Sequence, residues 1–140
     1  VLMNSQVGKA TMEELKKNYD KNRANIQNKE KELQRLKDEL EKQRPVLTEK
    51  AFRDKEQSYQ KKFRDYQDMV KDANDEMQSK RQEFLGKNVP EILKIVNAIG
   101  EKENYTLIID LSTLPVAYHA KGNVLTQRVI DEFNKIKKSK

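Results

Sequence analysis

The 140-residue sequence has no cysteine, no tryptophan and a single histidine, and it contains few glycines and prolines. Without cysteine, the chain forms no disulfide, no thiol nucleophile and no cysteine-ligated zinc site. Because His119 is the only histidine, neither a Ser-His-Asp triad nor a site with several histidine ligands can be assembled in one chain. The sequence therefore argues against an enzyme, and it predicts neither a metal site nor a cofactor.

Long apolar runs and a phosphate-binding loop are missing as well. No run approaches the roughly 20 apolar residues that a membrane-spanning helix requires. The Gly8-Lys9 pair lacks both the glycine upstream and the Ser or Thr downstream that a phosphate-binding loop uses. We therefore expect no nucleotide binding, and any work that the protein performs must proceed without ATP.

Charge is what the sequence has in excess. Charged residues make up 37% of the chain, hydrophobic residues only 35%, and the formal net charge is +6. Ordinary globular chains carry roughly 25% charged and 45 to 50% apolar residues. A thick core is therefore not expected, and the scarcity of glycine and proline places the charge on long helices, as in a coiled coil.

Two stretches repeat apolar residues with alternating spacings of four and three, which is the pattern of helices that pair in a coiled coil. Between them, Pro45 interrupts the helix and Thr48 can cap the next one. We therefore predict an antiparallel helical hairpin over residues 11–86, with its tip near 44–48. The first seam is Leu15, Tyr19, Asn22, Ile26, Lys29, Leu33, Leu36 and Leu40, and the second is Phe52, Glu56, Tyr59, Phe63, Tyr66, Val70, Ala73, Met77, Lys80 and Phe84.

The composition changes after Gly86, where a denser apolar helix is predicted to end at Gly100. Residues 105–111 and 116–120 have the apolar and β-branched character of two strands, and Thr126 is predicted to cap a final helix. We therefore expect residues 1–10 and 87–140 to form a small body that mediates oligomerisation. The predicted fold class is α+β, mostly helical, with a long coiled-coil arm that projects from a small β-containing body.

Basic residues gather around the hairpin tip. Between residues 42 and 64, eight basic residues stand against three acidic ones, a distribution that would attract acidic polypeptides, anionic membrane surfaces or phosphates. Three aromatic residues of the second seam, Phe52, Tyr59 and Phe63, lie in the same stretch and are large for a two-helix contact. The candidate contact residues are Lys42, Arg44, Lys50, Arg53, Lys55, Tyr59, Lys61, Lys62, Phe63 and Arg64.

The order of these features resembles the Skp/OmpH family of periplasmic chaperones for outer-membrane proteins. The C-terminal part carries the most specific match, and Val1 to Ser5, followed by Gly8 to Ala10, is similar to the family segment that leads into the first long helix. The matching C-terminal residues are Tyr105, Leu107, Ile108, Ile109, Asp110, Val116, Ala117, Tyr118, Leu125, Thr126, Val129 and Ile130.

The resemblance implies an ATP-independent holdase in the periplasm, with a signal peptide upstream of the present chain. It implies a homotrimer whose arms surround unfolded outer-membrane β-barrel proteins, keep them from aggregating and deliver them to the outer membrane. If so, Ile108, Val116 and Ile130 belong to the segments expected to join the subunits. An anionic membrane surface is a further candidate partner, and nucleic acid is not expected.

Two alternatives remain at this point. A prefoldin-like chaperone subunit also carries coiled coils on a β body, but its strands usually lie between the two helices, whereas here they are predicted to follow the hairpin. A coiled-coil scaffold or nucleic-acid-binding protein would use the basic tip to contact phosphates. Steeply salt-dependent binding to nucleic acid would favour that last alternative.

Overall fold

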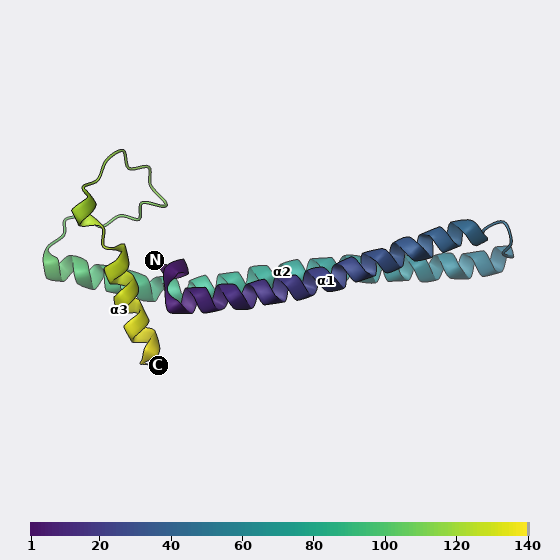
Figure 1. Cartoon of the computed structure of the whole chain (residues 1–140), viewed down its shortest axis with the longest axis horizontal. Coiled ribbons are helices and arrows are strands. Elements are labelled where there is room, and N and C mark those ends of the chain that lie inside the picture. Colours follow the sequence, from purple (N-terminus) through teal and green to yellow (C-terminus); the bar gives the residue numbers. More distant parts are fainter. Residues whose placement is uncertain (140) are drawn as a thin grey trace. The chain divides into compact units, whose positions relative to one another are not determined.

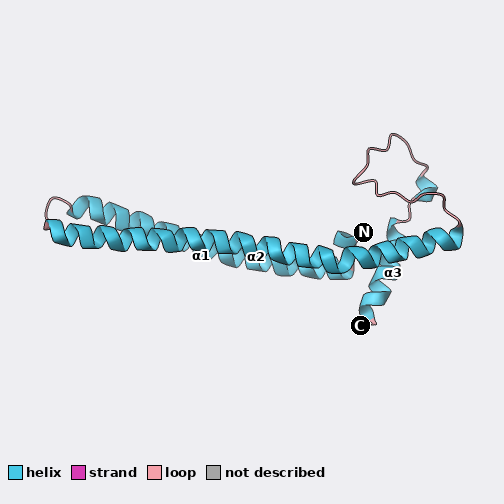
Figure 2. Cartoon of the chain, turned by 180° about the vertical axis from the view of Figure 1, so that it is seen from behind, coloured by secondary structure: helices cyan, strands magenta, loops and turns pink. Residues whose placement is uncertain are grey.

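The computed structural model describes residues 1–139, and none of these lies in a β-strand. The chain divides into two compact units, an arm unit of residues 15–80 and a second unit of residues 1–14 and 81–140, which we call the core unit. Figures 1 and 2 show the elements along the chain. They are η1 (Leu2–Asn4), α1 (Gln6–Gln43), α2 (Glu49–Glu103), η2 (Lys121–Asn123) and α3 (Thr126–Lys138).

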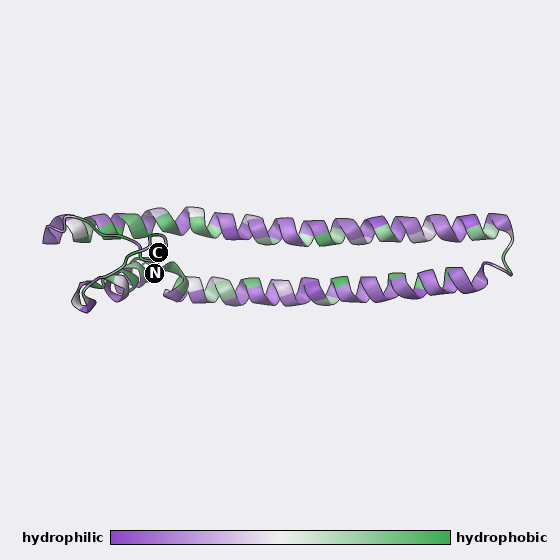
Figure 3. Cartoon of the chain, turned by 90° about the horizontal axis from the view of Figure 1, so that it is seen from above, coloured by the Kyte–Doolittle hydropathy of each residue, from purple (hydrophilic) through white to green (hydrophobic). Residues whose placement is uncertain are grey.

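In the arm unit, the chain turns back between α1 and α2, so the two helices lie side by side in opposite directions (Figures 1 and 2). Leu33, with 7% of its surface exposed, is the only buried residue among residues 15–80. Most other seam residues are half-buried, and the helices of this unit are predominantly hydrophilic (Figure 3). The predicted helical hairpin is present, and it is held by a narrow apolar contact.

The predicted seams match the half-buried faces with four exceptions. Tyr19 is 52% exposed, and its neighbour Asn18 is half-buried instead. Lys29, Glu56 and Phe63 are also exposed. Each residue turns the helix by about 100°. A four-three spacing therefore predicts which side of the helix is covered, but it does not decide which of two neighbouring residues at the edge of that side is buried.

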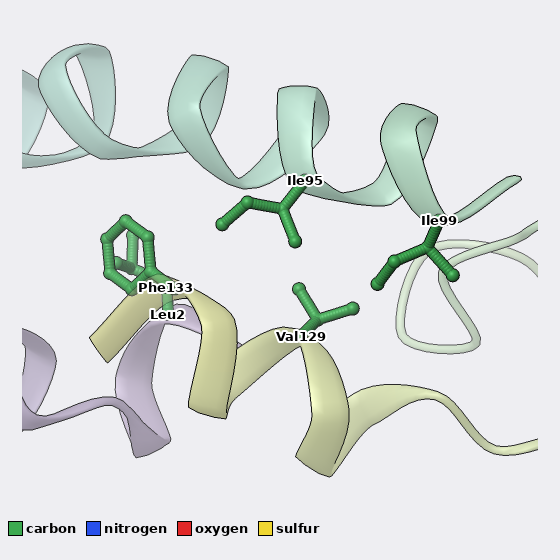
Figure 4. Packing of buried hydrophobic residues seen from close by; sticks show 5 residues of the cluster. All are labelled: Leu2, Ile95, Ile99, Val129 and Phe133. Atoms are coloured by element: carbon green, nitrogen blue, oxygen red, sulfur yellow. The ribbon is translucent and has the colours of Figure 1, made fainter. Parts of the chain in front are cut away.

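The core unit is built around a small hydrophobic cluster. Ile95 and Ile99 on α2 face Val129 and Phe133 on α3, and Leu2 completes the cluster (Figure 4). Phe133 has no exposed surface, and the other four residues are at most 9% exposed. The amphipathic pattern of α3 therefore places its apolar face on the C-terminal part of α2, as its spacing predicts.

The N-terminal turn is fixed by a buried serine. The hydroxyl of Ser5 donates a hydrogen bond to the carbonyl oxygen of Leu2 at 2.6 Å and accepts one from the amide of Gly8 at 3.0 Å. Ser5 thus caps the first turn of α1. The amide of Gln6 also donates to the Asn134 side chain at 2.9 Å, which ties this turn to α3.

Gly8 lies so close to η1 that any side chain would collide with it. A Cβ atom at this position would overlap the carbonyl oxygen of Leu2 and lie 2.9 Å from its carbonyl carbon. We expect Gly8→Ala to lower the free energy of unfolding of the core unit by about 1 to 3 kcal/mol, because the backbone must shift. Urea unfolding of the full chain measures the loss. Gly122→Ala is the matched control, since a Cβ there meets nothing within 4 Å, and an equal loss in both variants would contradict the explanation.

The predicted end of the long helix at Gly100 is wrong. α2 continues through Gly86 and Pro90 and ends at Glu103, and Asn104 adopts the left-handed conformation with φ of 56°. The amide of Tyr105 then donates to the carbonyl of Gly100 at 3.0 Å. Asparagine tolerates this conformation better than most residues, so the helix stops one turn later than the glycine suggests.

The two predicted strands are also wrong. Residues 105–111 and 116–120 lie in an irregular segment between α2 and α3, apart from a turn in which Asp110 accepts hydrogen bonds from the amide and hydroxyl of Ser112. These bonds hold the pKa of Asp110 below its usual value. Two short strands alone form a marginal sheet, and Pro115 removes one donor between them. The β-containing body and the α+β fold class are therefore corrected to a helical fold over the described residues.

The start of α3 differs slightly from the prediction. Thr126 is the first residue of α3, and Leu125 occupies the N-cap position without a side-chain hydrogen bond. Val129 donates its amide to the carbonyl of Leu125 at 3.0 Å. The helix is therefore positioned by the burial of its apolar face rather than by a threonine cap.

Candidate functional site

The tip of the arm unit is a tight turn between α1 and α2. The amides of Val46 and Leu47 both donate to the carbonyl of Gln43 at 3.0 Å. Thr48 then caps α2 as predicted, because its hydroxyl accepts a hydrogen bond from the amide of Ala51 at 3.3 Å. Val46 is 81% exposed at the turn. Val46 thus forms a short apolar projection between the end of α1 and the start of α2.

Few polar contacts join the two helices behind the tip. Lys62 on α2 contacts Glu32 on α1 at 2.6 Å, and Lys29 contacts the second oxygen of Glu32 at 3.0 Å. Nearer the tip, Lys55 donates a hydrogen bond to the side chain of Gln43. The hydrogen bonds and charges of Lys62 and Lys29 lower the pKa of Glu32 to about 2.

This lowered pKa predicts how the arm unit responds to acid. Because the Glu32 carboxylate is favoured in the folded arm, its contribution is complete above the ordinary pKa of 4.5 and is lost as the pH falls toward 2. We expect Glu32→Gln to lower the melting temperature modestly at pH 7 and to make no difference at pH 2. Thermal melts followed by circular dichroism provide the measurement. Glu30→Gln is the control, because Glu30 is exposed and has no ion pair among the described residues, and the same pH dependence in both variants would contradict the assignment.

The predicted basic contact residues are all exposed on the arm unit, but they are not equivalent. Arg53 pairs with Glu49, and Lys55 and Lys62 have the partners given above. Arg44 lies over the ring of Phe52 at 5.3 Å from its centroid. The remaining four form no ion pair among the described residues, and we call them the free basic residues: Lys42, Lys50, Lys61 and Arg64.

Three aromatic residues follow one another on α2 beside these charges. The ring centroids of Tyr59 and Phe63 are 6.4 Å apart, and those of Phe63 and Tyr66 are 6.3 Å apart. Phe63 is 41% exposed, and the two tyrosines are half-buried. The two predicted aromatic contact residues, Tyr59 and Phe63, therefore belong to one ladder of rings, of which only Phe63 is exposed. Its third member, Tyr66, was predicted only as a seam residue.

The structure also shows two hollows in the arm unit that the sequence did not predict. One, of about 410 Å³, lies at the tip and is lined in part by Arg44, Leu47 and Phe52. The other, of about 440 Å³, lies farther along and is lined by Asn22, Asn25 and several acidic residues of α2. The acidic residues of the second hollow recur at helical spacing, so their common face could have been predicted from the sequence. The hollow at the tip could not, because it depends on how the turn folds.

The three predicted oligomerisation residues lie in different surroundings. Ile130 on α3 is 5% exposed. Ile108 and Val116 are half-buried in the irregular segment, and the side chain of Ile108 lies close to Gly100. The same segment exposes large apolar side chains, among them Leu107 at 73% and Tyr118 at 84%. These two residues were identified for their family match and not as contact residues.

Two kinds of site are not found in the part of the chain that the structure describes. Within residues 1–139, no group of three or more histidine, cysteine or acidic side chains is arranged to hold a metal ion. None of the described helices combines the length and the apolar character needed to span a membrane. What the predicted contact residues present instead is a set of exposed cations, with aromatic rings in the same stretch of α2.

Comparison with known protein families places the chain beside one of them. The model of a family described as outer membrane protein (OmpH-like) matches residues 1–133. No curated protein matches the chain. The match covers both units, including the irregular segment and most of α3.

Proposed function

Because the chain belongs to the OmpH-like outer membrane protein family, we propose that it is an ATP-independent chaperone for unfolded outer-membrane β-barrel proteins. Members of this family are known as periplasmic chaperones of outer-membrane proteins. In this proposal the chain works in the periplasm, holds barrel precursors, prevents their aggregation and delivers them to the outer membrane. It is a binding protein rather than an enzyme.

The observation that carries the proposal is the combination of free cations and partly exposed rings on one stretch of the arm unit. Lys61 and Arg64 lie on α2 in the same stretch of sequence as the rings of Tyr59, Phe63 and Tyr66. Residues one or two positions apart do not share a helix face, so these cations and the rings occupy different faces of α2. An unfolded β-barrel strand alternates polar and apolar side chains, so a purely apolar groove would suit only half of its residues. A surface that offers both charges and rings can contact either kind.

The contacts on such a surface are individually weak. Exposed ion pairs contribute about 0 to 1 kcal/mol each, and the exposed rings offer limited area. Several arms that act on one client raise the effective concentration of each contact, so tight holding does not require a deep pocket. Release then requires only a competing site for the client, and no nucleotide hydrolysis.

The test is suppression of aggregation. A urea-unfolded outer-membrane β-barrel protein is diluted into buffer with the full chain, and light scattering follows aggregation. We expect the client to remain soluble at a ratio of one chaperone oligomer per client, without ATP. Continued aggregation at that ratio would contradict the proposal. A steeply salt-dependent gel shift with nucleic acid, together with no effect on the client, would support the nucleic-acid-binding alternative instead.

The proposal includes self-association as a homotrimer, a number that rests on the family resemblance. What supports self-association itself is the irregular segment of residues 104–125, which exposes seven large apolar side chains. Monomeric proteins rarely expose that many apolar side chains in one stretch without a partner. The seven residues are Tyr105, Leu107, Ile109, Leu111, Leu114, Tyr118 and Val124.

A charge in this segment should prevent self-association. We expect Ile108→Asp to reduce the native mass from about three times 16.5 kDa to that of one chain, because a buried carboxylate at an interface is strongly unfavourable. Light scattering coupled to size exclusion gives the mass. Leu107→Asp tests the same point without disturbing the packing near Gly100, since Leu107 is 73% exposed. A trimer that persists in both variants would exclude this segment as the contact.

A further inference from the structure

The hollow at the tip of the arm unit has the features of a small anchoring site. Its volume is about 410 Å³, and its lining consists of Arg44, Leu47, Glu49, Phe52, Arg53 and Glu56. All six residues come from the turn between α1 and α2 or from the first two helical turns of α2. Two of them are apolar, and the other four alternate between basic and acidic residues along the sequence.

The apolar part of the hollow is partly open. Leu47 and Phe52 are half-buried, so their remaining surface is available to a guest. The guanidinium of Arg44 already lies over the ring of Phe52 at 5.3 Å. A second aromatic ring can stack on this planar cation or pack against Phe52, and rings favour such stacked or tilted contacts.

Some of the charged residues that line the hollow form ion pairs, and others do not. Arg53 and Glu49 pair with each other. Arg44 forms no ion pair among the described residues, and neither does Glu56. The region is basic as a whole, because residues 42–56 contain five basic and three acidic residues. An incoming carboxylate would therefore be attracted to Arg44 and repelled by Glu56, which fixes the direction in which an acidic guest enters.

We infer that this hollow binds an aromatic side chain that has a carboxylate next to it in an extended segment of an unfolded polypeptide. The ring packs against Leu47 and Phe52, and the carboxylate pairs with Arg44. The inference rests on the proposed function, and it specifies which segments of a client the arm engages first. Clients that carry aromatic residues beside aspartate or glutamate are held at the tip in preference to others.

The experiment uses the whole 140-residue chain and three flexible glycine-serine peptides. The first peptide contains a Phe-Asp pair, the second contains Ala-Asp and the third contains Phe-Asn. Binding is followed by NMR of the backbone amides, which reports both the affinity and the location. We expect shifts concentrated on residues 44–56. The affinity for the Phe-Asp peptide should exceed that for Phe-Asn roughly threefold to fivefold, as one exposed charge contact provides, and it should also exceed that for Ala-Asp, which lacks the ring.

Three variants identify the contributing groups. Arg44→Gln should reduce the affinity for Phe-Asp to that for Phe-Asn, and Glu56→Gln should raise the affinity for Phe-Asp because a repulsion is removed. Arg23→Gln is the matched control, since Arg23 is an exposed arginine of the arm unit without an ion pair among the described residues. Equal losses in Arg44→Gln and Arg23→Gln would show that only the overall charge matters, and would overturn the inference.

Two other outcomes would also overturn it. The first is equal binding of all three peptides, or shifts spread evenly over residues 15–80. The second is a response of residues 44–56 to phosphatidylglycerol vesicles without a response to the Phe-Asp peptide, which would make the tip a lipid contact. If either occurs while the wild-type chain still suppresses aggregation of a barrel protein, the inference fails and the proposed function stands. Loss of that suppression in the wild-type chain would refute the proposed function itself.

Discussion

Phe133→Ala will lower the free energy of unfolding of the core unit by about 3 to 5 kcal/mol, because it removes a large apolar side chain and leaves a cavity behind. Phe133 is fully buried and packs with Leu2, Ile95 and Val129, which come from three different parts of the chain. Phe133 is the only member of the cluster with no exposed surface, and partly buried side chains such as Phe84 pack only against its outside. Truncation should therefore release both η1 and α3 from α2.

Hydrogen exchange of the full chain measures this effect for each unit separately. Amides of α3 should lose most of their protection in Phe133→Ala, while amides of the arm unit around Leu33 should keep theirs. Ile136→Ala is the control on the same helix, since Ile136 is 39% exposed, and its cost should be small. Full protection of α3 in Phe133→Ala would mean that the cluster in Figure 4 does not hold the core unit together.

Replacing the free basic residues of the arm tip with glutamine will weaken client binding on the order of tenfold to a hundredfold at low ionic strength. The variant combines Lys42→Gln, Lys50→Gln, Lys61→Gln and Arg64→Gln. None of the four side chains has an ion pair among the described residues, so the hairpin should keep its fold. The difference from wild type should shrink as salt is added, because screening removes the same attraction in the wild-type chain.

Titration of a fluorescently labelled unfolded barrel protein provides the affinity at each salt concentration. The matched control removes the same charge from exposed lysines elsewhere on the arm unit, through Lys16→Gln, Lys17→Gln, Lys31→Gln and Lys37→Gln. If the tip is the contact, the control variant should bind nearly as tightly as wild type. An equal loss in both variants would show that net charge, and not its place on the arm, attracts the client.

The helical part of the fold could be predicted because it depends on local signals. The four-three spacing identified the two arm helices, Pro45 and Thr48 marked the turn, and the apolar spacing of α3 identified its packed face. Each of these features depends on residues close in sequence. The end of α2 was misplaced by one turn because Gly100 and Asn104 are both suitable stops, and only the packing after the helix decides between them.

The strands could not be predicted correctly from residue type alone. Residues 105–111 have strong β propensity, but propensity describes how side chains fit on a sheet that already exists. In the structure these residues have no neighbouring strand, and the turn at Asp110 takes the end of the segment in another direction. A local pattern can specify an extended conformation, but it cannot supply the partner that hydrogen bonding requires.

The candidate site was predictable in composition and less so in arrangement. The sequence alone locates the charge of the tip, and the helical spacing of Tyr59, Phe63 and Tyr66 already suggests that their rings meet. The sequence does not show that Arg53 pairs with Glu49 while Lys50 forms no ion pair, because helical spacing alone allows either basic residue to pair. The hollow beside Arg44 depends on the path of the turn, which has no distinctive sequence signal.

The small number of buried residues in the arm unit has a consequence for its response to temperature. Leu33 is the only buried apolar side chain in residues 15–80, whereas the core unit buries a cluster around Phe133. The heat capacity change of unfolding rises with the apolar area that becomes exposed. The arm should therefore contribute little to that change for its length, and its stability curve should be flat. An arm of this kind would keep much the same stability in cold and warm surroundings, although that stability would always be low.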